Sequence, residues 1–109
     1  MRWCVNYLPQ ARNDLLNLDG SQRLLVRKAI EKVAQNPLPA AEGGYGKPLG
    51  SAMTTNLTGF MKVKLRSSGL RIVYKVVRNE SEMLVIIIGA RADDEVYDEA
   101  QKRIKQHNL

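Results

Sequence analysis

This chain of 109 residues is short of the side chains on which most enzymes depend. It has one histidine, His107, near the end of the sequence, so a catalytic dyad or triad built around imidazole is not expected. Its one cysteine, Cys4, excludes an internal disulfide framework and cysteine-rich zinc sites, which suits a reducing compartment such as the cytoplasm. Cys4 lies among strand-forming residues, and we expect it to be a small buried side chain.

Signals for membranes, metals and cofactors are also missing. The first residues, 1–4, lack the long apolar run of a signal peptide, and no segment approaches the length of a membrane span. No group of His, Asp, Glu or Cys has the spacing of metal ligands, and the glycines of residues 43–46 lie in irregular sequence. We therefore expect one cytoplasmic domain, residues 1–109, that uses no metal or cofactor and binds no membrane.

The charge that is present is mostly positive and is concentrated in one place. The chain has 17 Lys and Arg against 11 Asp and Glu, a formal net charge of +6. Between Lys62 and Arg78 every charged side chain is basic, and these basic residues alternate with strand-forming apolar ones. Such a distribution favours a polyanionic partner, either nucleic acid or an acidic protein, over a surface that merely aids solubility.

The first part of the chain predicts a strand and two helices. Apolar residues alternate over 2–7, and Pro9 suits the first turn of a helix, where its missing N–H would be unpaired anyway. Gly20 ends this helix, Ser21 is the expected N-cap of the next one, and Pro37 stops it. Because the connecting turn is so short, we expect the two helices to be antiparallel neighbours.

The remainder predicts a loop, three strands and a last helix. Residues 37–59 hold three of the four prolines and five of the eight glycines, which indicates a long surface loop. Strands are expected over 60–66, 70–78 and 83–90, and the last is apolar on both faces, as in a central strand or one that is covered on both sides. The expected fold is α+β: an N-terminal strand, a helical hairpin, a mainly antiparallel sheet with four strands in all, and a short C-terminal helix.

Alternation also determines which side chains of the hairpin share a face. A loop of two or four residues keeps the basic residues together, whereas a loop of three residues mixes the faces. We take the register with Arg66 opposite Arg71; the register of the last strand, and so the place of Arg91, stays open. The expected cationic face consists of Lys62, Lys64, Arg66, Arg71 and Lys75. The opposite face is apolar and available to the helices.

Lysine, arginine and tyrosine side chains can provide the functional groups needed to cleave RNA. The reaction needs a base for the 2′-OH proton, cations for the negative phosphorane, and an acid for the leaving 5′ oxygen. A lysine among other cations has its charged form disfavoured, which makes it a better base. Arginine binds phosphate through a bidentate fork, and a tyrosine ring can stack on a base and hold the nucleotide for in-line attack. The cationic face supplies the lysine base and the phosphate-binding arginines, and Tyr97 supplies the stacking ring.

Each of these residues also has a plain structural interpretation. The lysines can be solvent-facing strand residues, Arg71 can pair with Asp93 or Asp94, and Tyr97 can belong to the core. Taken together on one face without an acid, they favour binding of nucleic acid or of an acidic protein. Catalysis does not follow from the pattern alone.

The stretch Lys62–Val76, followed by Ile88-Gly89-Ala90-Arg91 and by Glu95-Val96-Tyr97, resembles toxins of the RelE/ParE superfamily. Within it the chain is most similar to the RelE branch of ribosome-dependent mRNA interferases. The N-terminal half fits this family more weakly, and residues 47–60 look longer than the equivalent connection in compact members. The resemblance implies a RelE-like microbial RNase fold and metal-independent cleavage of mRNA in the ribosomal A site, by attack of the 2′-OH on the adjacent phosphate.

The resemblance also implies roles for five positions. The general base is Lys64, the general acid is Arg91, the transition-state cations are Lys62 and Arg71, and the nucleotide-stacking aromatic is Tyr97. Two further cations of the same face, Arg66 and Lys75, are expected to bind RNA.

The partners implied by the resemblance are the ribosome, with its mRNA and rRNA, and a cognate antitoxin. Such antitoxins are acidic and partly disordered, which suits the charge of +6. DNA is contacted only indirectly, through the antitoxin. Two alternatives remain: a ParE-like, non-catalytic toxin that inhibits DNA gyrase, and a basic RNA-binding module without activity.

Overall fold

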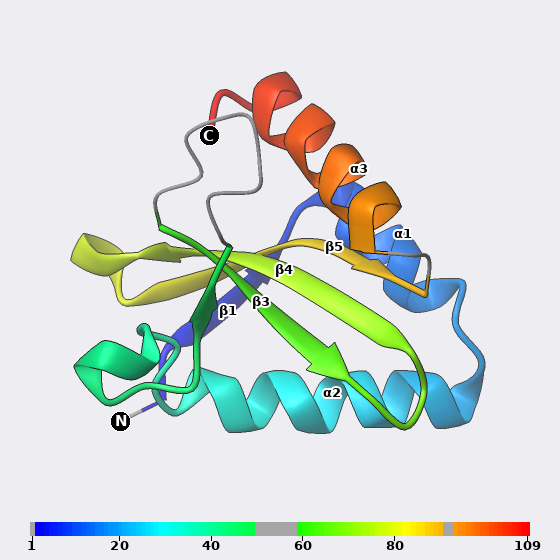
Figure 1. Ribbon diagram of the computed structural model, residues 1–109, viewed down its shortest axis with the longest axis horizontal. Helices are drawn as coiled ribbons and strands as arrows, with labels where there is room; N and C mark the ends of the chain where they lie inside the picture. Colours follow the sequence, from blue (N-terminus) through cyan, green and yellow to red (C-terminus); the bar gives the residue numbers. More distant parts are fainter. Residues whose placement is uncertain (1, 50–58, 91–92) are drawn as a thin grey trace.

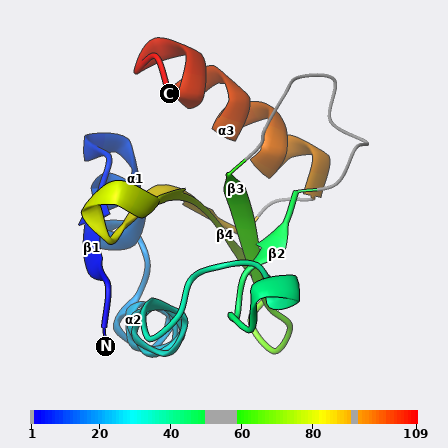
Figure 2. The same cartoon turned by 90° about the vertical axis from the view of Figure 1, so that its left-hand side faces the viewer.

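Five strands form one mixed sheet with a helix on each face (Figures 1 and 2). The computed structural model describes residues 2–49, 59–90 and 93–109, without the side chains of residues 93 and 94. The elements are β1 (Cys4–Tyr7), α1 (Pro9–Leu16), α2 (Gly20–Ala34), β2 (Lys47–Pro48), β3 (Phe60–Leu65), β4 (Leu70–Val77), β5 (Glu82–Gly89) and α3 (Asp93–Gln106). The strand order is β1-β5-β4-β3-β2. None of the helices in these described ranges combines the length and apolarity needed to cross a bilayer.

The α+β class expected from the sequence is confirmed, but the number of strands is not. β2, only two residues long, pairs antiparallel with β3 and raises the count to five. It lies inside the segment 37–59 that the sequence predicts as a loop, and residues 50–58 of that segment lie outside the described residues. β1 runs parallel to β5, whereas the other pairs are antiparallel. A two-residue strand has too little alternation to be recognised in a sequence.

The second helix begins at a different cap from the one expected. Asp19, and not Ser21, is the N-cap of α2: its carboxylate accepts the backbone N–H of Gln22 at 2.8 Å and the Ser21 hydroxyl at 2.8 Å. The Gln22 side chain in turn accepts the Asp19 N–H, which completes a capping box. The Gln22 N–H, followed by the Ser21 hydroxyl, lowers the pKa of Asp19. Asp19 is therefore the N-cap residue, and Ser21 contributes a hydrogen bond to the Asp19 carboxylate.

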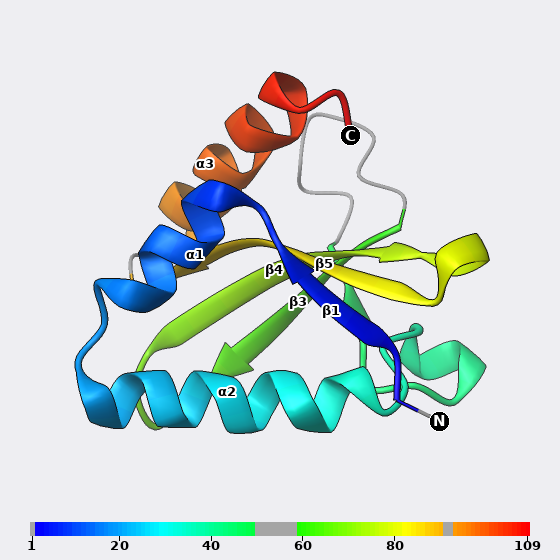
Figure 3. The ribbon, with the colours of Figure 1, turned by 180° about the vertical axis from the view of Figure 1, so that it is seen from behind.

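The two N-terminal helices form the expected hairpin, but they do not lie strictly side by side. In Figures 1 and 3 α1 and α2 run in roughly opposite directions, with α1 inclined to α2. The N–H of Leu8, just before α1, bonds to the Val85 carbonyl of β5 at 3.0 Å. Farther along α1, Asp14 accepts the N–H of Ile88 at 3.0 Å. These bonds to β5 hold α1 against the sheet and so set its direction.

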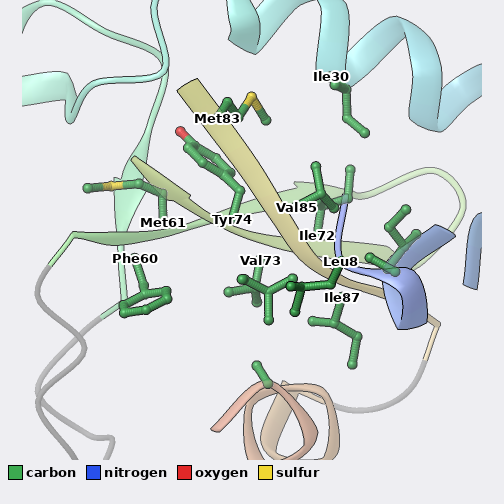
Figure 4. Close-up of a cluster of buried hydrophobic side chains, with 14 of the residues drawn as sticks. Leu8, Ile30, Phe60, Met61, Ile72, Val73, Tyr74, Met83, Val85 and Ile87 are labelled. Atoms are coloured by element: carbon green, nitrogen blue, oxygen red, sulfur yellow. The ribbon is translucent and has the colours of Figure 1, made fainter. Parts of the chain in front are cut away.

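The core has two layers, one on each face of the sheet (Figure 4). Ile72, Tyr74 and Val85 point to the α2 side, and Val73 and Ile87 point to the α3 side. β5 lies between β1 and β4, which confirms that the strand with two apolar faces is a central one.

Cys4 is exposed, so the expectation that it is buried was wrong. β1 is the edge strand of the sheet, and its side chains alternate between the sheet's two faces. Val5 and Tyr7 are half-buried, whereas Cys4 and Asn6 face solvent. A cysteine in an amphipathic edge strand is therefore not buried merely because it is small.

Gly46 allows a close approach that a larger residue would block. Its Cα faces the hydrogen bond in which Tyr74 donates to the Pro37 carbonyl at 2.8 Å, and a Cβ there would lie 2.6 Å from the Tyr74 hydroxyl. We expect Gly46→Ala to lower the free energy of unfolding by about 1–3 kcal/mol through overpacking. Urea denaturation measures this, with Gly20→Ala as the control, because nothing lies within 4 Å of a Cβ at Gly20. Equal stability of the two variants would contradict the expectation.

Candidate active site

The β3–β4 hairpin places two of the expected catalytic cations directly opposite each other. Lys64 pairs with Arg71 and Lys62 pairs with Val73, so the register with Arg66 opposite Arg71 was wrong by two residues. The loop has four residues, because Gly69, at φ 74°, turns the chain and donates its N–H to the Leu65 carbonyl at 2.9 Å. A shift of two residues preserves the faces, and the expected grouping of Lys62, Lys64 and Arg71 on one face therefore holds.

A small pocket of about 230 Å³ lies at the turn of this hairpin. Its described lining consists of Lys64, Leu65, Arg66, Gly69, Leu70 and Arg71, and none of these is acidic. Arg71 Nη1 donates to the Gly69 carbonyl at 2.8 Å, which turns the guanidinium toward the loop. Side chains opposite each other in an antiparallel pair have Cβ atoms about 5 Å apart, so Lys64 and Arg71 can contact the same phosphate. The pocket has the charge and size to bind a phosphodiester.

Lys62 connects the hairpin to α3. Its Nζ lies 6.0 Å from the centroid of the Tyr97 ring, a cation–π contact. Since Lys64 lies two residues farther along the same strand, it shares this α3-facing side of the sheet. Tyr97 itself is only 9% exposed. The structural interpretation of Tyr97 as a core residue therefore describes most of its ring, and its contact with Lys62 connects it to the cationic face.

Lys75, another of the expected RNA-binding residues, does not line the pocket. Lys75 lies four residues beyond Arg71 on β4, about 13 Å along the strand. Its Nζ is 5.6 Å from the Phe60 ring centroid and 3.5 Å from the Leu109 carbonyl oxygen, at the far end of this face. Arg91 lies outside the described residues, and its expected role stays a prediction. The last strand is nonetheless in register with the hairpin, because Gly89 is the partner of Arg71.

A buried ion network, which the sequence did not suggest, holds α3 against α1 and β5. Arg103 of α3 donates to Asp14 of α1 at 2.7 Å, to Glu99 at 3.2 Å and to the Ile86 carbonyl at 3.0 Å. Burial by itself lowers the pKa of Arg103, but the bonds to Asp14 and Glu99 outweigh it and raise that pKa above its usual value. The network fixes the helix that carries Tyr97. Only the Glu99–Arg103 spacing of four was visible in the sequence.

Nothing in the described ranges resembles a metal centre. Among these residues, no three His, Cys, Asp or Glu side chains are grouped closely enough to hold a metal ion. The charged side chains in the described lining of the pocket are those of Lys64, Arg66 and Arg71. This cationic pocket, on a sheet with one helix on each face, defines a small basic protein suited to handling a phosphodiester.

Comparison with known proteins gives the family. No family model matches the chain. The chain is 32% identical over 104 residues to the mRNA interferase toxin RelE of Escherichia coli K12, covering 95% of this chain and 99% of the relative. It is 28% identical over 105 residues to a putative RelE-like toxin protein of Escherichia coli, covering 96% and 100% of the two chains.

Solved structures of RelE toxins are also similar to this chain. A variant of E. coli toxin RelE in the free state superposes with a TM-score of 0.71 at 28% identity, covering 95% of this chain and 99% of that one. The same variant in complex with an antitoxin RelBc peptide gives a TM-score of 0.67 at 27% identity, covering 92% and 95%. The protein described here belongs to the RelE family of toxins.

Proposed function

We propose that this protein is the toxin of a type II toxin–antitoxin system and an endoribonuclease that cleaves mRNA in the ribosomal A site. The observation that carries the proposal is the pairing of Lys64 with Arg71 in a pocket that also contains Arg66. The name mRNA interferase, printed for the E. coli relative, supports the activity. The RelE structure with an antitoxin peptide supports a cognate antitoxin as the partner, and the formal net charge of +6 suits an acidic one.

In the proposed reaction the protein's own side chains move the protons. Lys64 removes the proton of the 2′-OH, and the 2′ oxygen attacks the adjacent phosphorus to form a 2′,3′-cyclic phosphate. The bond to the 5′ oxygen breaks, and Arg91 donates a proton to this leaving group. Lys62 and Arg71 stabilise the extra negative charge of the phosphorane. This sequence of steps requires no metal ion and no cofactor.

The proposed role of Tyr97 requires a conformational change. This residue orients the nucleotide by stacking, yet at 9% exposure its ring offers a base little surface in the present arrangement. Stacking therefore requires α3 or the Tyr97 side chain to shift when RNA enters. The contact of Tyr97 with Lys62, a residue of the cationic face, supports this role. Arg66 and, farther away, Lys75 are proposed to bind the RNA backbone.

The ribosome supplies the alignment that the pocket lacks. The described lining of the pocket offers lysine and arginine side chains for the reaction, and the proposal is that the ribosome-bound mRNA supplies the precise positioning of the 2′-OH. We expect purified protein to cut mRNA on ribosomes at least about 100-fold faster than the same RNA free in solution.

The experiment compares the two substrates with end-labelled RNA and equal protein concentrations. Equal rates on free and ribosome-bound RNA would remove the ribosome from the proposal. A protein that cuts neither substrate but inhibits DNA gyrase would establish the ParE-like alternative.

A further inference from the structure

The last residues of β5 lie beyond the end of β1. The described pairing of β1 with β5 ends at Val85, and β5 continues along β4 from there. The Ile86 carbonyl accepts a hydrogen bond from Arg103 Nη1 at 3.0 Å. The Ile88 N–H donates to Asp14 Oδ2 at 3.0 Å. The two members of an ion pair thus satisfy main-chain groups of β5 that lie past the end of β1.

The carboxylate of Asp14 joins three elements. Asp14 belongs to α1, which lies next to α3 in Figures 1 and 3. Its Oδ2 accepts both the Ile88 N–H of β5 and Arg103 Nη1 of α3, the latter at 2.7 Å, and its Oδ1 accepts Arg103 Nη2 at 3.3 Å. A bidentate pair of this kind fixes orientation as well as distance. One side chain therefore holds α1, α3 and the end of β5 in a defined arrangement.

The bond to Ile88 connects Asp14 to the cationic pocket. Gly89, the next residue of β5, is the partner of Arg71 on β4. Arg91, the proposed general acid, follows Ile88 by three residues in the sequence. Because hydrogen-bonded strands transmit displacements, a shift at Ile88 is passed to Gly89 and from there to Arg71.

The bond to Arg103 connects Asp14 to the proposed stacking aromatic. Arg103 lies six positions after Tyr97 on the same helix, about 9 Å along the axis of α3. Val96, the neighbour of Tyr97, packs closely on β5, since a Cβ at Gly89 would lie 3.4 Å from Val96 Cγ2. The Tyr97 ring in turn contacts Lys62. A change in the angle of α3 would therefore move this ring relative to the cationic face.

We propose that Asp14 is a positioning residue of the active site, which holds β5 and α3 so that Arg71 and Tyr97 act on the same nucleotide. The inference rests on the proposed function and adds to it a residue of α1, an element that supplies no side chain to the described lining of the pocket. Asp14 acts through the two elements that it joins and not on the reacting atoms. A misplacement of about 1 Å can cost about 100-fold in rate, so the loss of this contact is measurable.

Asp14→Asn is the first test. Its amide oxygen can still accept the Ile88 N–H, but its neutral side chain loses the charged pairing with Arg103. We expect the maximal single-turnover rate on ribosome-bound mRNA to fall by about 10- to 100-fold, while the protein concentration that gives half this rate changes by less than about threefold. Glu31→Gln is the matched control, because it makes the same chemical change in the exposed Arg2–Glu31 pair, and it should cleave at the wild-type rate.

Three results of this comparison would overturn the proposal. They are an unchanged maximal rate in Asp14→Asn, a loss confined to the half-maximal concentration, and an equal loss of rate in Glu31→Gln.

A double variant separates positioning from stability. Arg103→Met/Asp14→Leu replaces the pair by apolar side chains and should resist urea better than Arg103→Ala. Because it does not restore the bonds to the main chain of β5, it should still cleave at least about 10-fold more slowly than the wild type. Cleavage by this double variant at the wild-type rate would show that the pair serves stability alone, and the proposal would be wrong.

NMR measures the geometry without any cleavage. Lys62 Nζ lies over the Tyr97 ring, so the ring shifts the signals of the adjacent Lys62 methylene group. In Asp14→Asn these signals should move toward those of a free lysine, whereas in Glu31→Gln they should keep their wild-type positions. Unchanged signals in Asp14→Asn would contradict the placement of Tyr97 by Asp14. If the wild type cleaved no RNA, the proposed function would fail, and this measurement would still decide whether Asp14 places the ring.

Discussion

Lys64→Ala lowers the rate of ribosome-dependent mRNA cleavage by about 100- to 10,000-fold, the range expected when a general base is removed. The side chain is exposed at the end of β3, so its loss costs little packing and the protein should remain folded. The measurement is a single-turnover cleavage assay on ribosomes carrying mRNA, with circular dichroism to check the fold. Growth arrest on induction should disappear in parallel.

Two further variants separate the chemical role of Lys64 from its charge. Lys64→Arg keeps a cation for the phosphate but is a much poorer base, so RNA binding should persist while the cleavage step slows. Lys28→Ala removes a lysine that is exposed on α2 and should cleave at the wild-type rate. If Lys64→Ala arrested growth as strongly as the wild type, toxicity would not depend on this pocket, and a non-catalytic inhibitor would be favoured.

Arg103→Ala lowers the free energy of unfolding by about 3–5 kcal/mol, because it leaves a buried carboxylate without its partner. The side chains of Arg103 and Asp14 are only 7% and 19% exposed, and their ion pair joins residues of α3 and α1. The Ile86 carbonyl loses a donor in the same variant. Chemical denaturation at neutral pH, followed by fluorescence or circular dichroism, measures the change.

Glu99→Ala is the matched control for this network. Glu99 is 31% exposed and contacts Arg103 within one helix, so its removal should cost less than about 1 kcal/mol. The restoring variant is Arg103→Met/Asp14→Leu, which replaces the pair by apolar side chains and should regain part of the lost stability. Its recovery should be incomplete, because the Ile88 N–H loses its acceptor on Asp14. Equal losses for Arg103→Ala and Glu99→Ala would contradict a buried, α1-directed role for Arg103.

The predictions that succeeded rest on periodicity. Strand side chains alternate with a period of two, so the grouping of Lys62, Lys64 and Arg71 on one face survived even though the register was wrong by two residues. The central place of β5 followed for the same reason from its two apolar faces. Both predictions rest on local patterns, and a shift of the strand register by an even number of residues leaves such patterns unchanged.

The predictions that failed depend on contacts between distant parts of the chain. The oblique direction of α1 depends on Asp14, which bonds to Ile88 and Arg103 far along the sequence. No prediction was made for the neighbours of Lys75, which are Phe60 and Leu109 and depend on where the last residues return to the sheet. Spacing within one element carries no information about such partners.

By itself, the sequence determined the α+β class, the concentration of positive charge in one hairpin and the resemblance to RelE toxins, because composition and alternation are written residue by residue. Only the tertiary structure decided that Lys64 faces Arg71, that Tyr97 is nearly buried, and that Asp14 bonds to both β5 and α3. Each of these depends on which elements pack together, and packing is settled by the free energy of the whole chain and not by any single segment.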